Sequence, residues 1–239
     1  MKLEVNKNEL ERALIALGKL VSRTASLPQF RSLKIEMTEK EIHFSTCSAL
    51  EQITFRMESP SERSFLCVVS FEKFRMALRS CRNKTLELEY GEGILRVGET
   101  TLLHEQSVEW PVFCKGEQEA LSELPKEFVS LLAKVAPLVD REEAHSIMRG
   151  INLSREGITA TNGRELLHIP LPLNVDDFTI PLPIALLQTR TKEEGSLVTW
   201  NSRAGKICRV ETEHWIWQAY GLKGNYPDWR QIIPHQNSL

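Results

Sequence analysis

The sequence lacks the segments that would take a chain out of the cell or into a membrane. Residues 1–7 contain no apolar core of a secretory signal. No run approaches the roughly 18 apolar residues that a membrane-spanning helix needs, because proline or polar residues interrupt the longest apolar stretches. We therefore expect a cytoplasmic protein that has no membrane partner.

Paired cysteines and catalytic motifs are also missing. The five cysteines are odd in number and include no Cys-x-x-Cys pair, which argues against a disulfide framework and a structural zinc site. The sequence contains no glycine-rich phosphate loop and no GxSxG or HExxH motif. We expect reduced, mostly buried thiols, no metal, no cofactor and no catalytic residues. The protein is therefore predicted not to be an enzyme.

A large excess of either charge is absent as well. The 239 residues include 30 Lys and Arg against 32 Asp and Glu, which gives a formal net charge of −2. This near-neutral total excludes a polycation that coats nucleic acid by bulk charge, but it allows basic residues to gather on one face. With 41% hydrophobic residues, the chain has enough apolar surface for one or two packed domains.

What the sequence does contain is a repeat with a spacing of about 116 residues. An apolar stripe at helical spacing covers residues 8–21, and a second stripe follows Pro125. Trp110 and Tyr226 stand 116 residues apart, and a proline follows each of them. The alternative is two unrelated halves that look alike because α+β domains share short patterns. The matched spacings favour a true repeat.

Each copy reads as a helix, several strands, a second helix and more strands. The second helices are predicted over residues 70–81 and 182–188, and a hairpin over residues 86–97 is predicted to turn at Gly91-Glu92. The polar stretch 114–119 suits a linker between the copies. We predict an α+β fold of two repeated domains, residues 1–116 and 117–239, each with two helices packed on antiparallel sheets.

Two stretches of the second half resemble the sequence of one known family. Residues 160–166, Ala-Thr-Asn-Gly-Arg-Glu-Leu, resemble the family word A-T-D-G-H-R-L. Residues 224–234, Gly-Asn-Tyr-Pro-Asp-Trp-Arg-Gln-Ile-Ile-Pro, resemble the family word G-x-F/Y-P-D-Y-x-x-V/L-x-P. Residues 1–5, Met-Lys-Leu-Glu-Val, and residues 23–28, Arg-Thr-Ala-Ser-Leu-Pro, also carry the resemblance. On these motifs the chain resembles the bacterial DNA polymerase III beta subunit, the sliding clamp, over nearly its whole length.

The resemblance implies a DNA-clamp fold, in which strands form the outside of a ring and helices line a hole around duplex DNA. Family chains have three such domains, and this sequence matches the first two. Because six domains close the ring, a two-domain chain is expected to self-associate as a homotrimer. The implied partners are double-stranded DNA, held without sequence preference, and DNA polymerase or repair proteins that bind through a short linear motif.

The candidate DNA-binding residues are basic residues on or beside the predicted helices. Three arginines of residues 70–82 stand at i, i+4 and i+7, and sequence-independent binding needs such phosphate contacts. Arg23 matches a position where family clamps carry a DNA-contacting arginine. The alternative is an ordinary solvated helix face. The predicted residues are Arg12, Lys19, Arg23, Lys73, Arg75, Arg79, Arg82, Lys126, Lys134 and Arg190.

Two further sites follow from the resemblance. The partial pocket for a partner's linear motif would comprise Thr161, Gly163, Leu166 and Pro234, although in the family a strand of the third domain completes it. Plain core and turn packing is the alternative for these residues. The strand edge for self-association would comprise Thr100, Leu102 and Leu103. The strand of the second half that would pair with this edge in another copy is expected near Ile180 or Val198, and the sequence leaves that choice open.

Trp215 and Trp217 share one strand face because they are two residues apart. Base stacking or a protein interface competes here with packing in the sheet core, which is the favoured interpretation. For the whole chain, the leading hypothesis is a ring-forming processivity or tethering factor in replication or repair. The alternative is a clamp-derived interaction or regulatory module, a monomer or dimer that does not encircle DNA.

Overall fold

The computed structural model describes residues 2–59, 64–106, 108–113, 118–139 and 146–231. Within these ranges no helix is long and apolar enough to cross a membrane. The first half contains β1 (Lys2–Asn6), α1 (Lys7–Leu17), β2 (Ser32–Met37), β3 (Glu41–Cys47), β4 (Glu51–Glu58), β5 (Phe65–Ser70), α2 (Phe71–Ser80), β6 (Thr85–Gly91), β7 (Ile94–Val97) and β8 (Thr100–Leu103).

The second half contains the same succession of elements. It comprises β9 (Gln118–Leu124), α3 (Phe128–Val135), β10 (Gly150–Ser154), β11 (Gly157–Thr161), β12 (Leu166–Pro170), β13 (Phe178–Pro181), α4 (Ile184–Thr189), β14 (Gly195–Ser202), β15 (Gly205–Thr212) and β16 (Trp215–Tyr220). Short 3₁₀ turns accompany these elements at Pro28–Arg31, Ala136–Leu138, Ser146–Arg149 and Trp229–Gln231.

The strand order shows that the repeat is structural as well as sequential. In the first half the strands are ordered β5-β2-β3-β4 and β1-β6-β7-β8, and in the second half β13-β10-β11-β12 and β9-β14-β15-β16. Adding eight to each strand number of the first half reproduces the second, and each pair of helices follows equivalent strands. The predicted α+β repeat is therefore present, and we retain residues 1–116 and 117–239 as the proposed domains.

The two halves share one sheet of eight strands, ordered β5-β2-β3-β4-β16-β15-β14-β9. They join where β4 pairs antiparallel with β16, with Trp217 opposite Ile53. Trp217 is fully buried, and its indole Nε1–H donates to the Glu51 carboxylate at 2.9 Å. The spacing of Trp215 and Trp217 therefore marks a sheet core, as favoured from the sequence.

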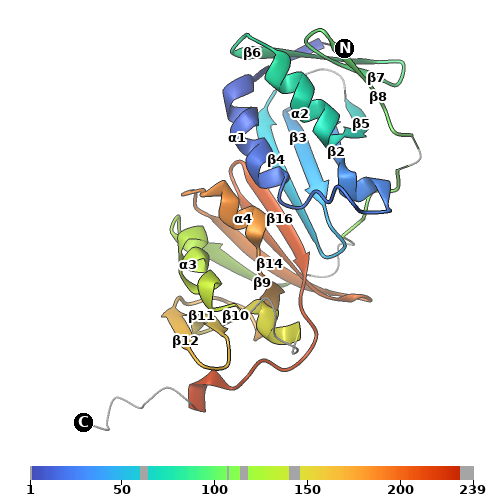
Figure 1. The fold of residues 1–239 in the computed structure, drawn as a ribbon. Helices are drawn as coiled ribbons and strands as arrows, with labels where there is room; N and C mark the ends of the chain where they lie inside the picture. Colours follow the sequence, from blue (N-terminus) through green and yellow to red (C-terminus); the bar gives the residue numbers. More distant parts are fainter. Residues whose placement is uncertain (1, 60–63, 107, 114–117, 140–145, 232–239) are drawn as a thin grey trace.

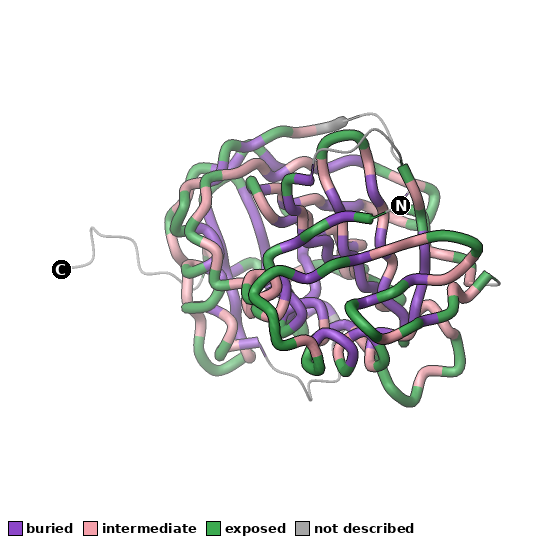
Figure 2. The backbone as a smooth tube through the Cα atoms, turned by 90° about the horizontal axis from the view of Figure 1, so that it is seen from above, coloured by how far each residue is buried: buried purple, intermediate pink, exposed green. Residues whose placement is uncertain are grey.

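The helices lie together on one side of this sheet. Figure 1 shows α2, α1, α4 and α3 in succession along the molecule, and α1 contacts both α2 and α4 while α3 contacts α4. Each helix buries an apolar stripe, such as Phe71, Phe74 and Leu78 of α2. Figure 2 shows that buried residues concentrate between the layers, with exposed residues on the surrounding turns. Burial of these stripes fixes which helix faces point to solvent.

Several predicted boundaries were wrong, each for a local reason. The first helix ends at Leu17 rather than Val21, because the chain turns at Gly18. Residues 118 and 119, predicted as part of a linker, begin β9, whose partner β14 lies about 80 residues further on. The hairpin turns at Glu92 and Gly93, both with positive φ, rather than at Gly91-Glu92. A two-residue hairpin loop needs positive φ at both central positions when it forms a type I′ turn.

The β4–β16 junction makes stability depend on pH through Glu51. Burial raises the pKa of this carboxyl from 4.5 to about 7, with the Trp217 hydrogen bond opposing the shift. The pKa of Glu51 is higher in the folded state than in the unfolded state. The free energy of unfolding therefore falls as pH rises from 4.5 to about 7, and it stays lowered at higher pH. At 1.36 kcal/mol per pKa unit, the full loss is about 3 kcal/mol.

We predict that Glu51→Gln raises the free energy of unfolding by about 2–3 kcal/mol at pH 8 and by much less at pH 5. The amide oxygen of the introduced glutamine can still accept the Trp217 hydrogen bond. Urea unfolding of both proteins at the two pH values measures the difference. An equal effect at pH 5 and pH 8 would contradict titration of Glu51 as the cause.

Candidate nucleic-acid interface

The helix layer has an excess of basic over acidic residues, whereas the rest of the chain has the opposite excess. The helices and their flanks, residues 7–23, 70–84, 125–139 and 182–192, hold 13 Lys and Arg against 4 Glu. The rest of the chain holds 17 Lys and Arg against 28 Asp and Glu. The near-neutral total therefore conceals a basic helix side and an acidic remainder. A surface of one sign attracts a polyanion from a distance, and salt weakens this attraction.

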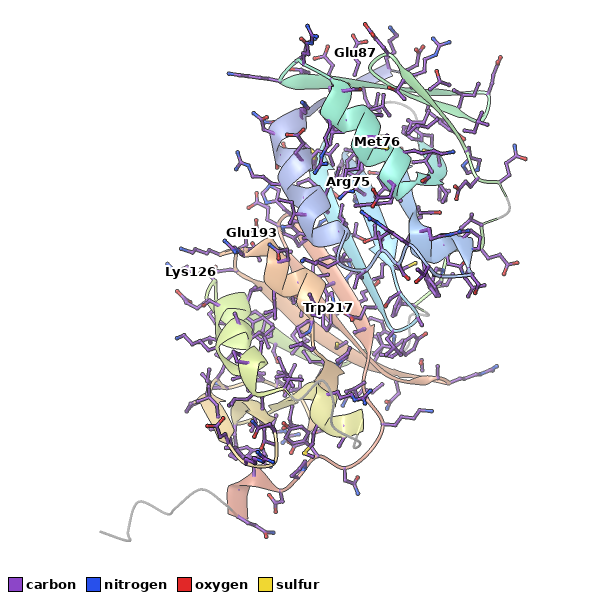
Figure 3. The ribbon with its side chains drawn as sticks, viewed as in Figure 1. Arg75, Met76, Glu87, Lys126, Glu193 and Trp217 are labelled. Carbon is purple, nitrogen blue, oxygen red and sulfur yellow. The ribbon has the colours of Figure 1, made fainter. Side chains whose placement is uncertain are left out.

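A groove between α1 and α2 concentrates part of this charge. Its volume is about 470 Å³, and its rim carries Lys19, Arg75 and Arg79 with a single carboxylate, Glu11. Its lining also includes Leu14, Ile15, Gly18 and Leu78. Figure 3 shows Arg75 on α2 beside α1. Three of the predicted cations, which come from two helices about 60 residues apart, thus border one groove.

Glu72 partly neutralises two of the predicted cations. Its Oε1 lies 3.2 Å from an Nη of Arg23, and its Oε2 lies 2.6 Å from an Nη of Arg75. One carboxylate therefore ties the loop after α1 to the first turn of α2. In the sequence, Glu72 is only an interruption of the basic pattern near a helix start. Its bridging role depends on Arg23, 49 residues away, which local spacing does not place beside it.

The other predicted cations lie along the layer and point into solvent. None of these eight takes part in an ion pair within the part of the chain that the structure describes, and all eight are exposed. Lys126 precedes α3, while Arg190 ends α4 in a left-handed conformation with φ 52°. The eight are Arg12, Lys19, Lys73, Arg79, Arg82, Lys126, Lys134 and Arg190.

Apolar side chains also reach solvent in the helix layer, which the sequence pattern did not predict. Ile15 of α1 is 57% exposed and Met76 of α2 is 68% exposed, and Ile184 of α4 is exposed as well. Figure 3 shows Met76 on the outward side of α2 next to Arg75. The surface is therefore basic with apolar points, rather than uniformly charged.

Most of the predicted motif pocket lies at the turn between β11 and β12. Thr161 Oγ1 donates to the Glu165 carbonyl at 2.7 Å and accepts from the Gly163 N–H at 3.1 Å, so it shapes the turn. Gly163 adopts φ 80°, which favours glycine. Leu166 opens β12 opposite Thr161. The structure thus brings three of the four pocket residues together, and Pro234 lies outside the described residues.

A group of side chains next to this turn was not predicted from the sequence. Trp229 stacks on His168 of β12 with ring centroids 4.2 Å apart, and burial lowers the His168 pKa. Arg230 lies over the Trp229 ring and binds the carboxylates of Glu156 and Asp177 at 2.9 and 3.2 Å. These contacts fasten the residue 229–231 turn to the second half. No local pattern in the sequence pairs residue 229 with residue 168.

The predicted oligomer edge is a true sheet edge. β8 lies at the end of the sheet β1-β6-β7-β8, where Leu102 is buried and Leu103 is 73% exposed. Of the two expected partner strands, the one near Val198 is wrong, because β14, which holds Val198, lies between β15 and β9. β13, which holds Ile180, is an end strand of its sheet, where the Leu222 N–H donates to the Thr179 carbonyl, so the prediction near Ile180 stays a prediction. The other end of that sheet is β12.

Four of the five cysteines lie in the described ranges, and none of these four is paired in a disulfide. Cys47, Cys67 and Cys208 are buried and unpaired, and burial raises the pKa of the first two to about 12. Cys114 lies outside the described residues. In the described ranges no three His, Cys, Asp or Glu side chains are grouped as metal ligands.

Comparison with known proteins finds similar structures but no matching sequence family. No family model matches this sequence, and no curated protein matches it either. The structure is similar to the DNA polymerase III subunit beta from Pseudomonas aeruginosa, with TM-score 0.81 and 16% identity over 100% of this chain and 69% of that one. It is similar to the DNA polymerase sliding clamp from Bacillus subtilis, with TM-score 0.80 and 19% identity over 99% and 68%.

A third similar structure is the Helicobacter pylori beta clamp bound to a DNA ligase peptide, with TM-score 0.79 and 18% identity over 99% of this chain and 70% of that one. The chain thus spans about two thirds of the length of these clamps. At such low identity the likeness establishes the fold. The predicted DNA-clamp fold, with helices on one side and a continuous sheet on the other, is therefore confirmed.

Proposed function

We propose that this chain, which has the sliding-clamp fold, acts in the cytoplasm as a clamp-like factor that holds onto duplex DNA and tethers a replication or repair protein there. The observation that carries the proposal is the basic helix layer, with 13 Lys and Arg against 4 Glu in its segments. Phosphate contacts of this kind hold DNA without reading its sequence and allow sliding. Tethering raises the local concentration of a partner and needs no catalytic group.

Salt dependence tests the DNA part of this proposal. We expect the chain to bind a fluorescently labelled duplex at low salt, with equal affinity for two unrelated base sequences. Between about 50 and 200 mM salt the affinity should fall by at least tenfold, because bound cations are released from the DNA. Fluorescence anisotropy measures both quantities. Absence of binding at low salt, or a strong preference for one sequence, would contradict the proposal.

Self-association as a homotrimer is the second part of the proposed function. β8 offers an open edge with an exposed leucine, and open edges pair with other strands. The resemblance to ring-forming clamps favours six domains, hence three copies of this chain. Light scattering over a range of concentrations should give three times 27.4 kDa. A monomer at every concentration would rule out the ring.

A partner motif is proposed to bind at the β11–β12 turn. The H. pylori clamp of similar fold was solved with a DNA ligase peptide, and this chain places Thr161, Gly163 and Leu166 together. The rim differs from the family word, since Arg164 and Glu165 stand where the family has His and Arg. We therefore propose a short peptide partner whose charges differ from those of the usual motif.

The non-ring interaction module remains the second candidate, and two observations favour it. Ile15 and Met76 are exposed in the helix layer, where a purely phosphate-binding surface would be polar. Glu72 also forms ion pairs with Arg23 and Arg75, two of the predicted DNA-binding residues. A monomeric mass combined with salt-insensitive DNA binding would select this candidate over the ring.

A further inference from the structure

We propose that Glu72 is an internal competitor of DNA. Its carboxylate holds Arg23 and Arg75 in the free protein, and a DNA phosphate has to displace it before it can bind either arginine. The inference rests on the DNA binding in the proposed function and goes beyond it, because it assigns a residue that weakens this binding. The consequence is a protein that holds duplex DNA less tightly than its basic residues would allow.

Glu72 bridges the two arginines with one carboxylate oxygen each. The Arg23 Nε–H donates to Oε1 at 3.3 Å and an Nη of Arg23 lies 3.2 Å from the same oxygen, while an Nη of Arg75 donates to Oε2 at 2.6 Å. Guanidinium groups bind phosphate oxygens with the same charge-assisted hydrogen bonds that they make to a carboxylate. The Glu72 carboxylate therefore fills the place between the two guanidinium groups that a phosphate would take.

Glu72 differs in this respect from the other acidic residues of the helix layer, which are Glu9, Glu11 and Glu127. In the described ranges Glu11 pairs with Lys7 at 3.4 Å. Among the ion pairs of those ranges, only the ones of Glu72 involve predicted DNA-binding residues. One carboxylate thus competes for two of these cations.

The two segments that Glu72 connects have fastenings of their own. The Lys73 N–H donates to Ser70 Oγ at 3.5 Å, so α2 has a side-chain cap at its start. In the loop after α1, the Ser22 N–H donates to the Phe30 carbonyl at 2.9 Å. The contacts of Glu72 therefore act mainly on the availability of the arginines rather than on the fold of these segments.

The ion pairs of Glu72 are exposed enough for DNA to break them. The side chain of Arg23 is 72% exposed, and those of Glu72 and Arg75 are 35% and 31% exposed. Ion pairs at such positions are weak, whereas duplex DNA brings a dense row of phosphates. Arg75 also lines the groove that Lys19 and Arg79 border, beside α1 (Figure 3). DNA held by those two cations thus lies next to the ion pair that it has to open.

Removing the charge of Glu72 tests the inference by the direction of the effect. We expect Glu72→Gln to raise the affinity for a labelled duplex by about 3- to 10-fold at low salt, because a phosphate then binds both arginines without first breaking an ion pair. The matched control is Glu127→Gln. It also removes one negative charge at the N-terminal end of a helix of the same layer, but from a residue without an ion pair in the described ranges. The control should change the affinity by less than about twofold.

A second substitution separates competition from a supporting role. Arg23→Gln should lower the affinity by about twofold in the wild type and by about fivefold in the Glu72→Gln background, because only there is Arg23 free of its carboxylate. If Glu72 instead positioned Arg23 for DNA, Glu72→Gln would weaken binding and Arg23→Gln would matter less in that background. Glu72→Ala should give the same gain as Glu72→Gln, and thermal melting establishes that each variant is folded.

Fluorescence anisotropy of the five proteins distinguishes failure of this inference from failure of the proposed function. A Glu72→Gln variant that binds no more tightly than the wild type, or a Glu127→Gln variant that gains as much, would overturn the inference. The salt-dependent binding of the wild type would then still support the proposed function. Absence of DNA binding by the wild type and by every variant at low salt would overturn both.

Discussion

Reversing the charges of Lys19 and Arg79 is expected to lower the affinity for duplex DNA by about 10- to 100-fold at low salt. Both side chains border the groove between α1 and α2, and both are exposed. Neither has an ion-pair partner in the described ranges. Arg75 is the weaker target, because Glu72 already binds it and a glutamate at residue 75 would face that carboxylate.

The effect should appear in the salt dependence as well as in the affinity. Each lost phosphate contact lowers the slope of log affinity against log salt by about one, so the double variant Lys19→Glu with Arg79→Glu should lose about two. The matched control is Arg203→Glu with Lys223→Glu, which changes the net charge equally at exposed residues outside the helix layer. Equal losses in both double variants would indicate a bulk charge effect and contradict the helix layer as the DNA-binding surface.

Replacing Trp217 by alanine should destabilise the folded chain by about 3–5 kcal/mol. Trp217 is fully buried where β16 pairs with β4, so its removal leaves a cavity at the junction of the halves. The change also removes the donor that bonds the Glu51 carboxylate. Stabilities of natural domains are about 5–15 kcal/mol, so this one residue should account for a large part of the total.

Urea unfolding at pH 7 measures this effect against two controls. Trp217→Phe keeps most of the apolar area and should recover more than half of the loss. Trp110→Ala removes a half-buried indole whose Nε1–H donates to Gln52 at 3.0 Å, and should cost only about 1–2 kcal/mol. A loss of less than about 1 kcal/mol for Trp217→Ala would show that the junction does not depend on this side chain.

The parts of the fold that follow local periodicity were predictable from the sequence. The stripe of Phe71, Phe74 and Leu78 identified α2 almost to its ends, and Ser70 caps it as its position suggests. The 116-residue spacing revealed the repeat that the strand order confirms. β9 escaped notice because its polar start resembles a linker. Only its pairing with β14 makes it a strand.

The candidate site, like the fold, could be predicted from the sequence only in part. Sequence spacing identified the arginines of α2, since residues three or four apart share a helix face. It could not show that Glu72 binds Arg23 and Arg75 together, that Trp229 stacks on His168, or that Ile15 and Met76 are exposed among the cations. The contacts of Glu72 with Arg23 and of Trp229 with His168 join residues distant in sequence, and packing rather than periodicity sets these partners.

The sequence by itself determined the two copies, the apolar stripes of the helices and the supply of basic residues along them. Each of these follows from the order of side chains along a local element. Only the tertiary structure decided that β4 pairs with β16, that the four helices lie on one side, and that β8 lies at the end of its sheet. Strand pairing depends on which backbone edges meet in space, and that choice is made by burial of the whole core rather than by any single stretch of sequence.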